Sequence, residues 1–548
     1  MEAISIVMIL MIAVIISGVI SRLLPLPVPL PLVQIAFGAA IASVANLGVT
    51  LDPEIFFVLF IPPLLFLDGW RIPKEGLLRD KGTIIELALG LVVFTVVGLG
   101  FLISWMIPSM PLSVAFALAA IVSPTDPVAV SSIAARVPIP KRLMHILEGE
   151  SLLNDVSGLV FMRFAVIAAL TGSFSLFEAS LSFLWLAAGG IVAGAGVTWS
   201  VSRLKSWVSR KLGEDTGSQI LISLVIPFVA YLIAERLHAS GILAAVTAGL
   251  VMSYSEQTGQ ALATTRIRRS GVWDTAQFAL NGAMFVLLGE QLPQIAAGAA
   301  DVVSETGHHE PAWLMVYVLA INLALLALRF LWVWVSLRFT MYRATRRGQK
   351  QQAPSWRLIA ATSLAGVRGA ITLAGILTLP LLLQDGSPFP TRDLAIFLAA
   401  GVIIFSLIGA SIGLPILLKG VKLPPESHDQ VAEDRARIAA AEAAIRAVEN
   451  LQAGLAANRA DADLYASGTA HLVEFYRQRI SAFSAAGADE LESRRRARDI
   501  DNQLWTNALR AERDAVYAEA RARRLPDEIS RKLVREIDLN EARLAAGS

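Results

Sequence analysis

Residues 148–160 read EGESLLNDVSGLV and lie between two apolar segments, MHIL and FMRFAVIAAL. The stretch contains the polar or charged side chains of Glu148, Glu150, Asn154 and Asp155. A charged residue near the centre of a bilayer costs about 2.5 to 3.5 kcal/mol on insertion scales. Because ionisable residues kept inside a membrane are usually functional, this stretch predicts a site within a membrane-spanning helix.

The composition is that of a polytopic membrane protein. Of 548 residues, 55% are hydrophobic and 17% are charged, whereas about a quarter are charged in soluble domains. The net charge of +2 and the lack of a long basic run argue against a nucleic-acid partner. The sequence has no cysteine, no GxxxxGKS/T phosphate loop and no HExxH zinc motif, so we expect no cofactor.

Hydropathy divides the first 420 residues into thirteen candidate spans. About 20 mostly apolar helical residues cross a hydrocarbon core of roughly 30 Å. We expect the first span to be retained rather than cleaved as a signal peptide, because no basic region precedes it. The predicted spans are 2–20, 30–48, 52–69, 83–107, 111–134, 142–170, 178–200, 217–236, 239–253, 272–292, 312–335, 357–383 and 393–417.

The distribution of Lys and Arg residues predicts how these spans are oriented in the membrane. Loops after odd-numbered spans carry basic clusters such as Arg203, Lys205, Arg210 and Lys211, whereas loops after even-numbered spans carry only Arg392. The positive-inside rule then places the N-terminus outside and the C-terminus in the cytoplasm. We expect a multi-pass protein of the cytoplasmic (inner) membrane, surrounded by its lipids.

The composition changes after about residue 420. The segment PPESHDQVAEDRARIAAAEAAIRAVENL starts with a proline break and continues in helical proportions of Ala, Glu and Arg. The sequence therefore predicts a transmembrane domain over 1–420 and a soluble cytoplasmic helical domain over 421–548. A charge-rich tail is most often a solvated helix surface, with dimer contact and regulation as alternatives.

The polar residues of the sixth span fall on two adjoining helix faces. Ser151 and Asp155 are four residues apart, as are Glu150 and Asn154, so each pair shares a face. Carboxylate and hydroxyl oxygens suit a small hard cation. Ser151 and Asp155 are therefore candidate cation ligands, while Glu150 and Asn154 face a neighbouring helix. The alternative is a buried polar network that joins helices.

The fifth span contains IVSPTDPVAVSSI, in which Pro124 and Pro127 flank Thr125 and Asp126. Two prolines so close together predict a helix break within the membrane. A break frees backbone carbonyls, including that of Thr125, to bind an ion. Asp126 would compensate the positive ends of the half-helices. The alternative is a proline kink capped by Asp126.

The twelfth span contains SLAGVRGAITLAGILTLP, in which Gly366, Gly369 and Gly375 weaken the helix. Arg368 places a permanent cation among these apolar residues. We expect Glu150 to be its acidic partner, although Arg368 also suits the negative C-terminal ends of half-helices. The alternative is that Arg368 snorkels to the cytoplasm.

The two predicted breaks are seven spans apart, so they run in opposite directions through the membrane. Spans 1 to 6 and 8 to 13 can therefore form inverted repeats, as in secondary transporters, with span 7 as the link. The predicted fold is an all-α polytopic membrane protein of about thirteen transmembrane helices, with two inverted repeats and broken crossing helices, plus the helical C-terminal domain.

Four stretches, FIPPLLFLDGW, SPTDPVAV, EGESLLND and GVRGAITLA, resemble the sodium/proton exchanger family of the monovalent cation:proton antiporter superfamily. The match is to the bacterial branch with a long cytoplasmic tail, and it covers about residues 1–420. The resemblance implies thirteen spans, a homodimer, and a core domain that moves against a dimerisation domain.

The resemblance also implies a role for each residue at the ion site. Asp155 corresponds to the carboxylate that binds a cation or protons, and Asn154 to the Asn that stabilises it. Ser151 and Thr125 correspond to additional ligands, so Na⁺ would bind Asp155, Ser151 and Thr125.

Further residues correspond to the supporting structure of the family's site. Glu150 and Arg368 resemble its core ion pair, and Asp126 resembles its dipole-compensating acid. Relatives often carry an acid where this chain has Leu67, and Asp68 follows one residue later. Asp68 is therefore a candidate replacement.

The expected function is secondary antiport of Na⁺ for H⁺, with Li⁺ or K⁺ as alternative cations, serving pH and sodium homeostasis. Asn154 beside Asp155 implies electroneutral exchange by the family analogy. A K⁺/H⁺ antiporter of the same fold is the alternative, and a cation channel is less favoured because no filter-like stretch repeats. An enzyme is not expected, since no general base accompanies Ser151 or Asp155.

Overall fold

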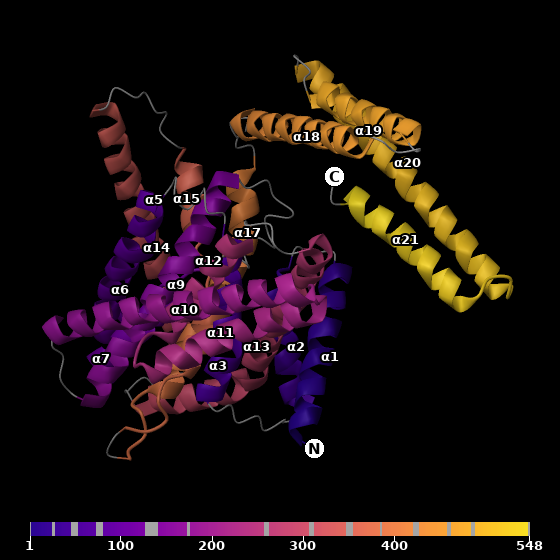
Figure 1. Cartoon of the computed structure of the whole chain (residues 1–548). Helices are drawn as coiled ribbons and strands as arrows, with labels where there is room; N and C mark the ends of the chain where they lie inside the picture. Colours follow the sequence, from indigo (N-terminus) through magenta and orange to yellow (C-terminus); the bar gives the residue numbers. More distant parts are fainter. Residues whose placement is uncertain are drawn as a thin grey trace. The chain divides into compact units, whose positions relative to one another are not determined.

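The computed structural model describes residues 2–24, 28–44, 53–72, 81–126, 141–171, 176–256, 262–305, 312–346, 355–383, 386–419, 427–456, 462–483 and 488–545. The chain forms two compact units, Met1–Lys422 and Leu423–Ser548 (Figure 1). Within the described ranges every regular element is a helix, apart from an isolated bridge between Leu382 and Pro388. The predicted all-α fold is confirmed.

Each predicted span coincides with at least one described helix of the first unit. Seven helices are long and apolar enough to cross a membrane by themselves, and the total of thirteen stays a prediction. The helices are α1 (Glu2–Leu23), α2 (Leu30–Val44), α3 (Pro53–Arg71), α5 (Lys81–Ile85), the π-helix η1 (Glu86–Leu91), α6 (Val92–Met106), α7 (Leu112–Val122), α9 (Lys141–Thr171), α10 (Leu176–Leu212), α11 (Thr216–Arg236), α12 (Gly241–Glu256), α13 (Ala263–Glu305), α14 (Ala312–Arg346), α15 (Trp356–Leu364), α16 (Ala370–Leu377) and α17 (Arg392–Leu418).

The twelfth predicted span is broken, and α7 ends at the place where the fifth span is predicted to break. Helix α7 ends at Val122, and residues 123–126 that follow it are not helical. The twelfth span is divided into α15 and α16 by the non-helical residues 365–369. The remainder of the fifth predicted span, 127–134, lies outside the described residues.

The two breaks contact each other. The backbone N–H of Asp126 donates a hydrogen bond to the carbonyl of Val367 at 2.7 Å. Gly369 makes this approach possible, because a Cβ atom there would lie 1.6 Å from Oδ2 of Asp126. Unsatisfied backbone groups inside a membrane are costly, so the crossing breaks satisfy part of each other's backbone.

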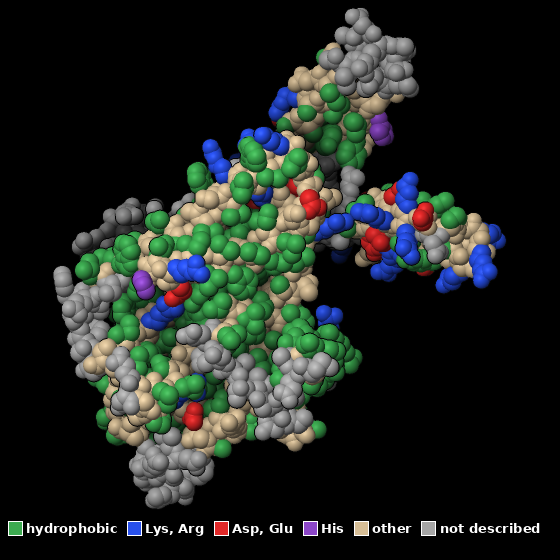
Figure 2. Space-filling view, turned by 60° about the horizontal axis from the view of Figure 1, so that its bottom comes forward, with side chains coloured by type: hydrophobic (Ala, Val, Ile, Leu, Met, Phe, Trp, Pro, Cys, Tyr) green, Lys and Arg blue, Asp and Glu red, His purple; other side chains and the backbone are tan. Residues whose placement is uncertain are grey.

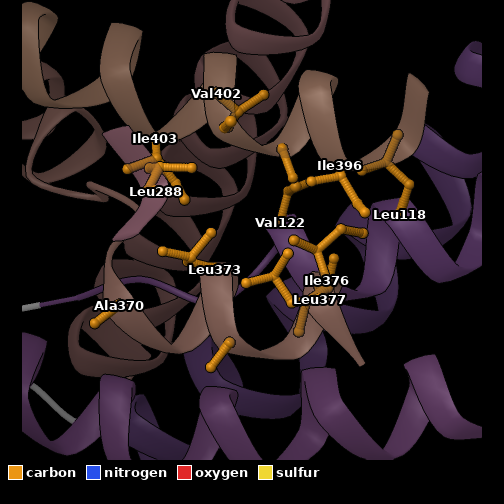
Figure 3. Packing of buried hydrophobic residues seen from close by; sticks show 14 of the residues in the cluster. Leu118, Val122, Leu288, Ala370, Leu373, Ile376, Leu377, Ile396, Val402 and Ile403 are labelled. Carbon is orange, nitrogen blue, oxygen red and sulfur yellow. The ribbon is translucent and has the colours of Figure 1, made fainter. Parts of the chain in front are cut away.

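Apolar side chains pack around this crossing. Figure 3 shows Leu118 and Val122 of α7 close to Ile376 and Leu377 of α16, with Ile396 of α17 beside them. All five side chains are buried. The core of the first unit therefore packs α7, which precedes the first break, against α16, which follows the second.

Close helix pairs elsewhere depend on glycine. A Cβ atom at Gly38 of α2 would come within 2.0 Å of a carbonyl of α13, and one at Gly289 of α13 would come equally close to α2. Gly69 of α3 and Gly249 of α12 play the same part in a second pair. Small residues let transmembrane helices approach closely, which is how helices gain packing energy in lipid.

The outer surface of the first unit suits a lipid environment. On the face seen in Figure 2, hydrophobic side chains cover much of this unit and charged groups are sparse. Large apolar residues such as Trp105, Val192 and Leu323 are strongly exposed. A soluble protein rarely exposes so much apolar surface, so the chain is a multi-pass membrane protein.

The second unit contains four described helices: α18 (Ser427–Ala456), α19 (Ala462–Phe483), α20 (Ala488–Arg521) and α21 (Asp527–Ala545). Helix α18 packs on α19, and α20 packs on α21. Arg513 of α20 forms ion pairs with Glu541 and, at 2.9 Å, with Asp538 of α21. The hydrogen bond to Glu541 raises the pKa of the Arg513 guanidinium above its usual value.

Candidate ion-binding site

Helix α9 carries the polar residues that the sequence singles out. Asp155 is 2% exposed and Glu150 is fully buried, and Ser151 and Asn154 are buried as well. Because the pairs Ser151/Asp155 and Glu150/Asn154 are each one helical turn apart, the four residues occupy adjoining faces of α9, and Asn154 contacts the break that follows α7. The structure therefore brings a buried polar cluster to the crossing of the two broken helices.

The Asp155 carboxylate accepts few hydrogen bonds from the described protein groups. Among the described residues its hydrogen bond comes from the Ser151 hydroxyl, which donates to Oδ2 at 3.4 Å. That distance is long for a bond between oxygens. Buried carboxylates normally have good partners, so Asp155 has room on its oxygens for a cation or a proton. Ser151 and Asp155 lie together, as the helical spacing predicts.

Asn154 links α9 to the break after α7. Its Nδ2 atom donates to Oγ1 of Thr125 at 3.0 Å, and the Thr125 hydroxyl in turn donates to Oε1 of Glu150 at 3.4 Å. The Thr125 hydroxyl thus contacts Asn154 and Glu150, and no hydrogen bond joins it to Asp155 within the described chain. The Oδ1 atom of Asn154 is buried and has no protein partner among the residues described.

The predicted direct ion pair between Glu150 and Arg368 is not formed, although the two charges still interact electrostatically. Glu150 instead pairs with Arg329 of α14, whose Nη1 and Nη2 atoms donate to Oε1 and Oε2, the second at 2.8 Å. Both side chains are buried, and Arg329 also donates to the carbonyl of Thr362 at 3.3 Å. Gly366 leaves space for this guanidinium, because a Cβ atom there would lie 2.7 Å from Nε of Arg329.

Arg368 contacts backbone carbonyls at the breaks. Its Nε donates to the carbonyl of Val122 at 2.9 Å, and Nη1 donates to the carbonyl of Gly366. Val122 is the last residue of α7, so the guanidinium lies at the negative C-terminal end of a half-helix. This position matches the second role that the sequence allows for Arg368, compensation of helix ends, and excludes snorkelling to the surface because the side chain is buried.

Arg329 is the residue that the sequence analysis missed. It is the only charged residue in the predicted span 312–335. An isolated guanidinium within such a run requires a buried acid, and this signal was available from the sequence. Counting basic residues only in loops, as the positive-inside rule does, passes over it.

Asp68 lies on the side of α3 that faces the site. Electrostatic interactions connect it with both Asp155 and Asp126. The adjacent Leu67 packs into a separate apolar cluster with Phe66 and Trp273. Asp68, rather than Leu67, is therefore placed to act on the ion site from α3.

Comparisons with known proteins show the family of the chain. Residues 7–420 match the family described as "Sodium/hydrogen exchanger, transmembrane". The chain is 41% identical over 549 residues to an uncharacterized Na⁺/H⁺ exchanger, YjcE, of Escherichia coli K12, with 99% of each chain covered. It is 44% identical over 419 residues to the sodium, potassium, lithium and rubidium/H⁺ antiporter of Bacillus pumilus, covering 76% of this chain and 61% of that protein.

A solved structure shares the fold. The sodium proton antiporter MjNhaP1 from Methanocaldococcus jannaschii superposes with a TM-score of 0.57 at 19% sequence identity. The match covers 77% of this chain and 99% of the archaeal chain.

Proposed function

Because the chain belongs to the sodium/hydrogen exchanger family and is a cation/proton antiporter, we propose that it exchanges Na⁺ for H⁺ one for one across the cytoplasmic membrane. The exchange would serve pH and sodium homeostasis. The observation that carries this proposal is Asp155, a buried carboxylate whose hydrogen bond within the described part of the chain is long and which lies near two non-helical segments. Discontinuous helices near the bilayer midplane are where secondary transporters bind substrate.

The proposed cycle uses one carboxylate for both substrates. Asp155 binds Na⁺ with the help of the Ser151 hydroxyl, or it binds a proton instead. The loaded site carries the same charge in both cases, which makes the exchange electroneutral. Asn154 keeps this balance, because it is neutral and uses its N–H to hold Thr125. A backbone carbonyl of the break, such as that of Thr125, supplies a further ligand for Na⁺.

The neighbouring charges support the site without carrying the ion. Arg329 compensates Glu150 within the membrane, and Arg368 compensates the carbonyls at the end of α7. Asp126 compensates the positive half-helix ends of the crossing. Asp68 adds negative potential at Asp155, which favours the binding of a cation.

The proposed orientation has the N-terminus outside and the C-terminal unit in the cytoplasm. Basic residues in the predicted loops support it. Asp215 caps the start of α11 in one of these loops. Hydrogen bonds from the side chain and backbone of Ser218 lower the pKa of Asp215. We further propose that the protein acts as a homodimer, on the family analogy.

The test is exchange in proteoliposomes. Asp155→Asn should abolish sodium-driven proton flux, because the neutral amide lacks the negative charge that binds Na⁺ and does not take up a proton. Asp274→Asn is the control, since Asp274 is an exposed carboxylate whose partner is Arg71 on α3. Undiminished flux in Asp155→Asn would refute the assignment. An imposed voltage should leave the flux of the unmodified protein unchanged, and a voltage-dependent flux would refute electroneutrality.

Potassium/proton antiport is the second candidate. It is favoured by the similarity to the Bacillus pumilus protein, whose name includes potassium, lithium and rubidium. Comparison of Na⁺, Li⁺ and K⁺ in the same flux assay separates the candidates. The proposal of Na⁺/H⁺ exchange requires that the KM for Na⁺ or Li⁺ be lower than the KM for K⁺.

A further inference from the structure

A cavity of about 520 Å³ lies between α3, α9 and α11, close to the candidate ion site. Leu159 lines this cavity one helical turn beyond Asp155, and Arg163 lines it one turn further along α9. The remaining lining residues include Phe57 of α3 and Tyr231 of α11. The cavity therefore extends from the neighbourhood of Asp155 toward the C-terminal end of α9, which the proposed orientation places outside.

Two opposite charges meet across this cavity. Arg163 of α9 and Glu235 of α11 are the charged residues among its described lining, and Nη2 of Arg163 donates to Oε1 of Glu235 at 3.1 Å. Their side chains are 34% and 36% exposed, so neither is sealed inside the protein. Tyr231 interacts with both side chains, and the guanidinium also lies 6.0 Å from the ring centre of Phe57. The pair is thus held by α3, α9 and α11 together.

The pair also connects two groups of helices. Helix α9 packs mainly against α7 and η1, whereas α11 packs mainly against α10 and α12. Direct packing of α9 on α3 or α12 is slight, and α9 and α11 are not a principal packing pair. A shift of α9 relative to α11 that exceeds the reach of these two side chains would separate the Arg163 guanidinium from the Glu235 carboxylate.

We propose that Arg163 and Glu235 form a charge gate on the ion path between this cavity and Asp155. This inference rests on the proposed function of Asp155. While the pair is formed, Glu235 neutralises a guanidinium that would otherwise repel an approaching cation. When α9 moves, the pair opens and the exposed guanidinium opposes entry from this side.

The size of the effect follows from helix geometry. Eight residues separate Asp155 and Arg163, so their positions along α9 differ by about 12 Å. At this distance and an effective dielectric constant near 20, an uncompensated unit charge weakens cation binding at Asp155 by about tenfold. Loss of Glu235 should therefore raise the apparent KM for the cation by about tenfold.

The experiment compares the two faces of the membrane. Proteoliposomes with a single protein orientation are assayed with Na⁺ supplied from one side and then from the other. Glu235→Gln should raise the KM for Na⁺ on the cavity side by about tenfold and leave the KM on the opposite side unchanged. Adding Arg163→Gln to this variant should restore the KM, because it removes the uncompensated charge. Asp274→Asn, which breaks the exposed pair with Arg71, should change neither KM.

The alternative is that the pair only holds α9 against α11. In that case Glu235→Gln would lower the maximal rate or the amount of folded protein, with equal KM values for both faces, and the double variant would be no better than the single one. Either result would overturn the gate. Failure of the ion site itself would be seen separately, as undiminished flux in Asp155→Asn.

Discussion

The buried ion pair between Glu150 and Arg329 makes a specific prediction for Arg329→Gln. The guanidinium donates two hydrogen bonds to the carboxylate, and both side chains are shielded from water. The substitution removes the direct counter-charge of the buried Glu150 carboxylate, which among the described residues keeps the hydrogen bond from Thr125 and the electrostatic interaction with Arg368. Breaking a buried pair in this way costs about 3 to 5 kcal/mol, because the remaining ion is desolvated without its counter-charge.

The double variant Glu150→Gln/Arg329→Gln provides the decisive comparison. It removes both charges, and replacing a whole buried pair by neutral groups is often close to neutral in stability. We therefore expect the double variant to be less destabilised than Arg329→Gln alone. Several kcal/mol of coupling should separate the double variant from the sum of the two single variants.

The assay is unfolding by SDS titration in mixed micelles, with sodium-driven proton flux measured on the same preparations. The matched control is the cycle of Glu150→Gln with Arg368→Gln, because Arg368 donates to backbone carbonyls and not to Glu150. Its coupling should be clearly weaker than that of the Arg329 cycle. A loss below about 1 kcal/mol for Arg329→Gln, or a stronger coupling to Arg368, would refute the reasoning.

Two further substitutions test the contact between the two breaks and the contribution of Asp68 to the ion site. Gly369→Ala places a Cβ atom 1.6 Å from Oδ2 of Asp126, so we expect destabilisation of about 1 to 3 kcal/mol from overpacking and reduced flux. Gly196→Ala meets nothing within 4 Å and should leave stability unchanged or slightly raised; equal unfolding midpoints for the two variants would contradict this. Asp68→Asn removes negative potential at Asp155, so the KM for Na⁺ should rise several-fold in the flux assay. An unchanged KM would exclude Asp68 from the site.

Much of the fold follows from local rules that the sequence obeys. Apolar runs of sufficient length predict the helices, since backbone groups in lipid must be satisfied within a segment. Pro124 and the glycines around Arg368 predict the breaks, because they remove a donor or weaken the helix where they stand. The pairing of Ser151 with Asp155 follows from the helical repeat alone.

The charged residues within apolar runs and the positions of the helix breaks can be read from the sequence, because both depend on neighbours along the chain. The partner of each buried charge follows from the packing of the helices. Glu150 had Arg329 on α14 and Arg368 in the break between α15 and α16 available, and the choice depends on how these segments pack. The Arg163–Glu235 pair and the contact of Gly369 with Asp126 likewise join residues far apart in sequence. Helical periodicity fixes the face a residue occupies on its own helix, whereas the residue opposite that face is set by the packing of separate segments.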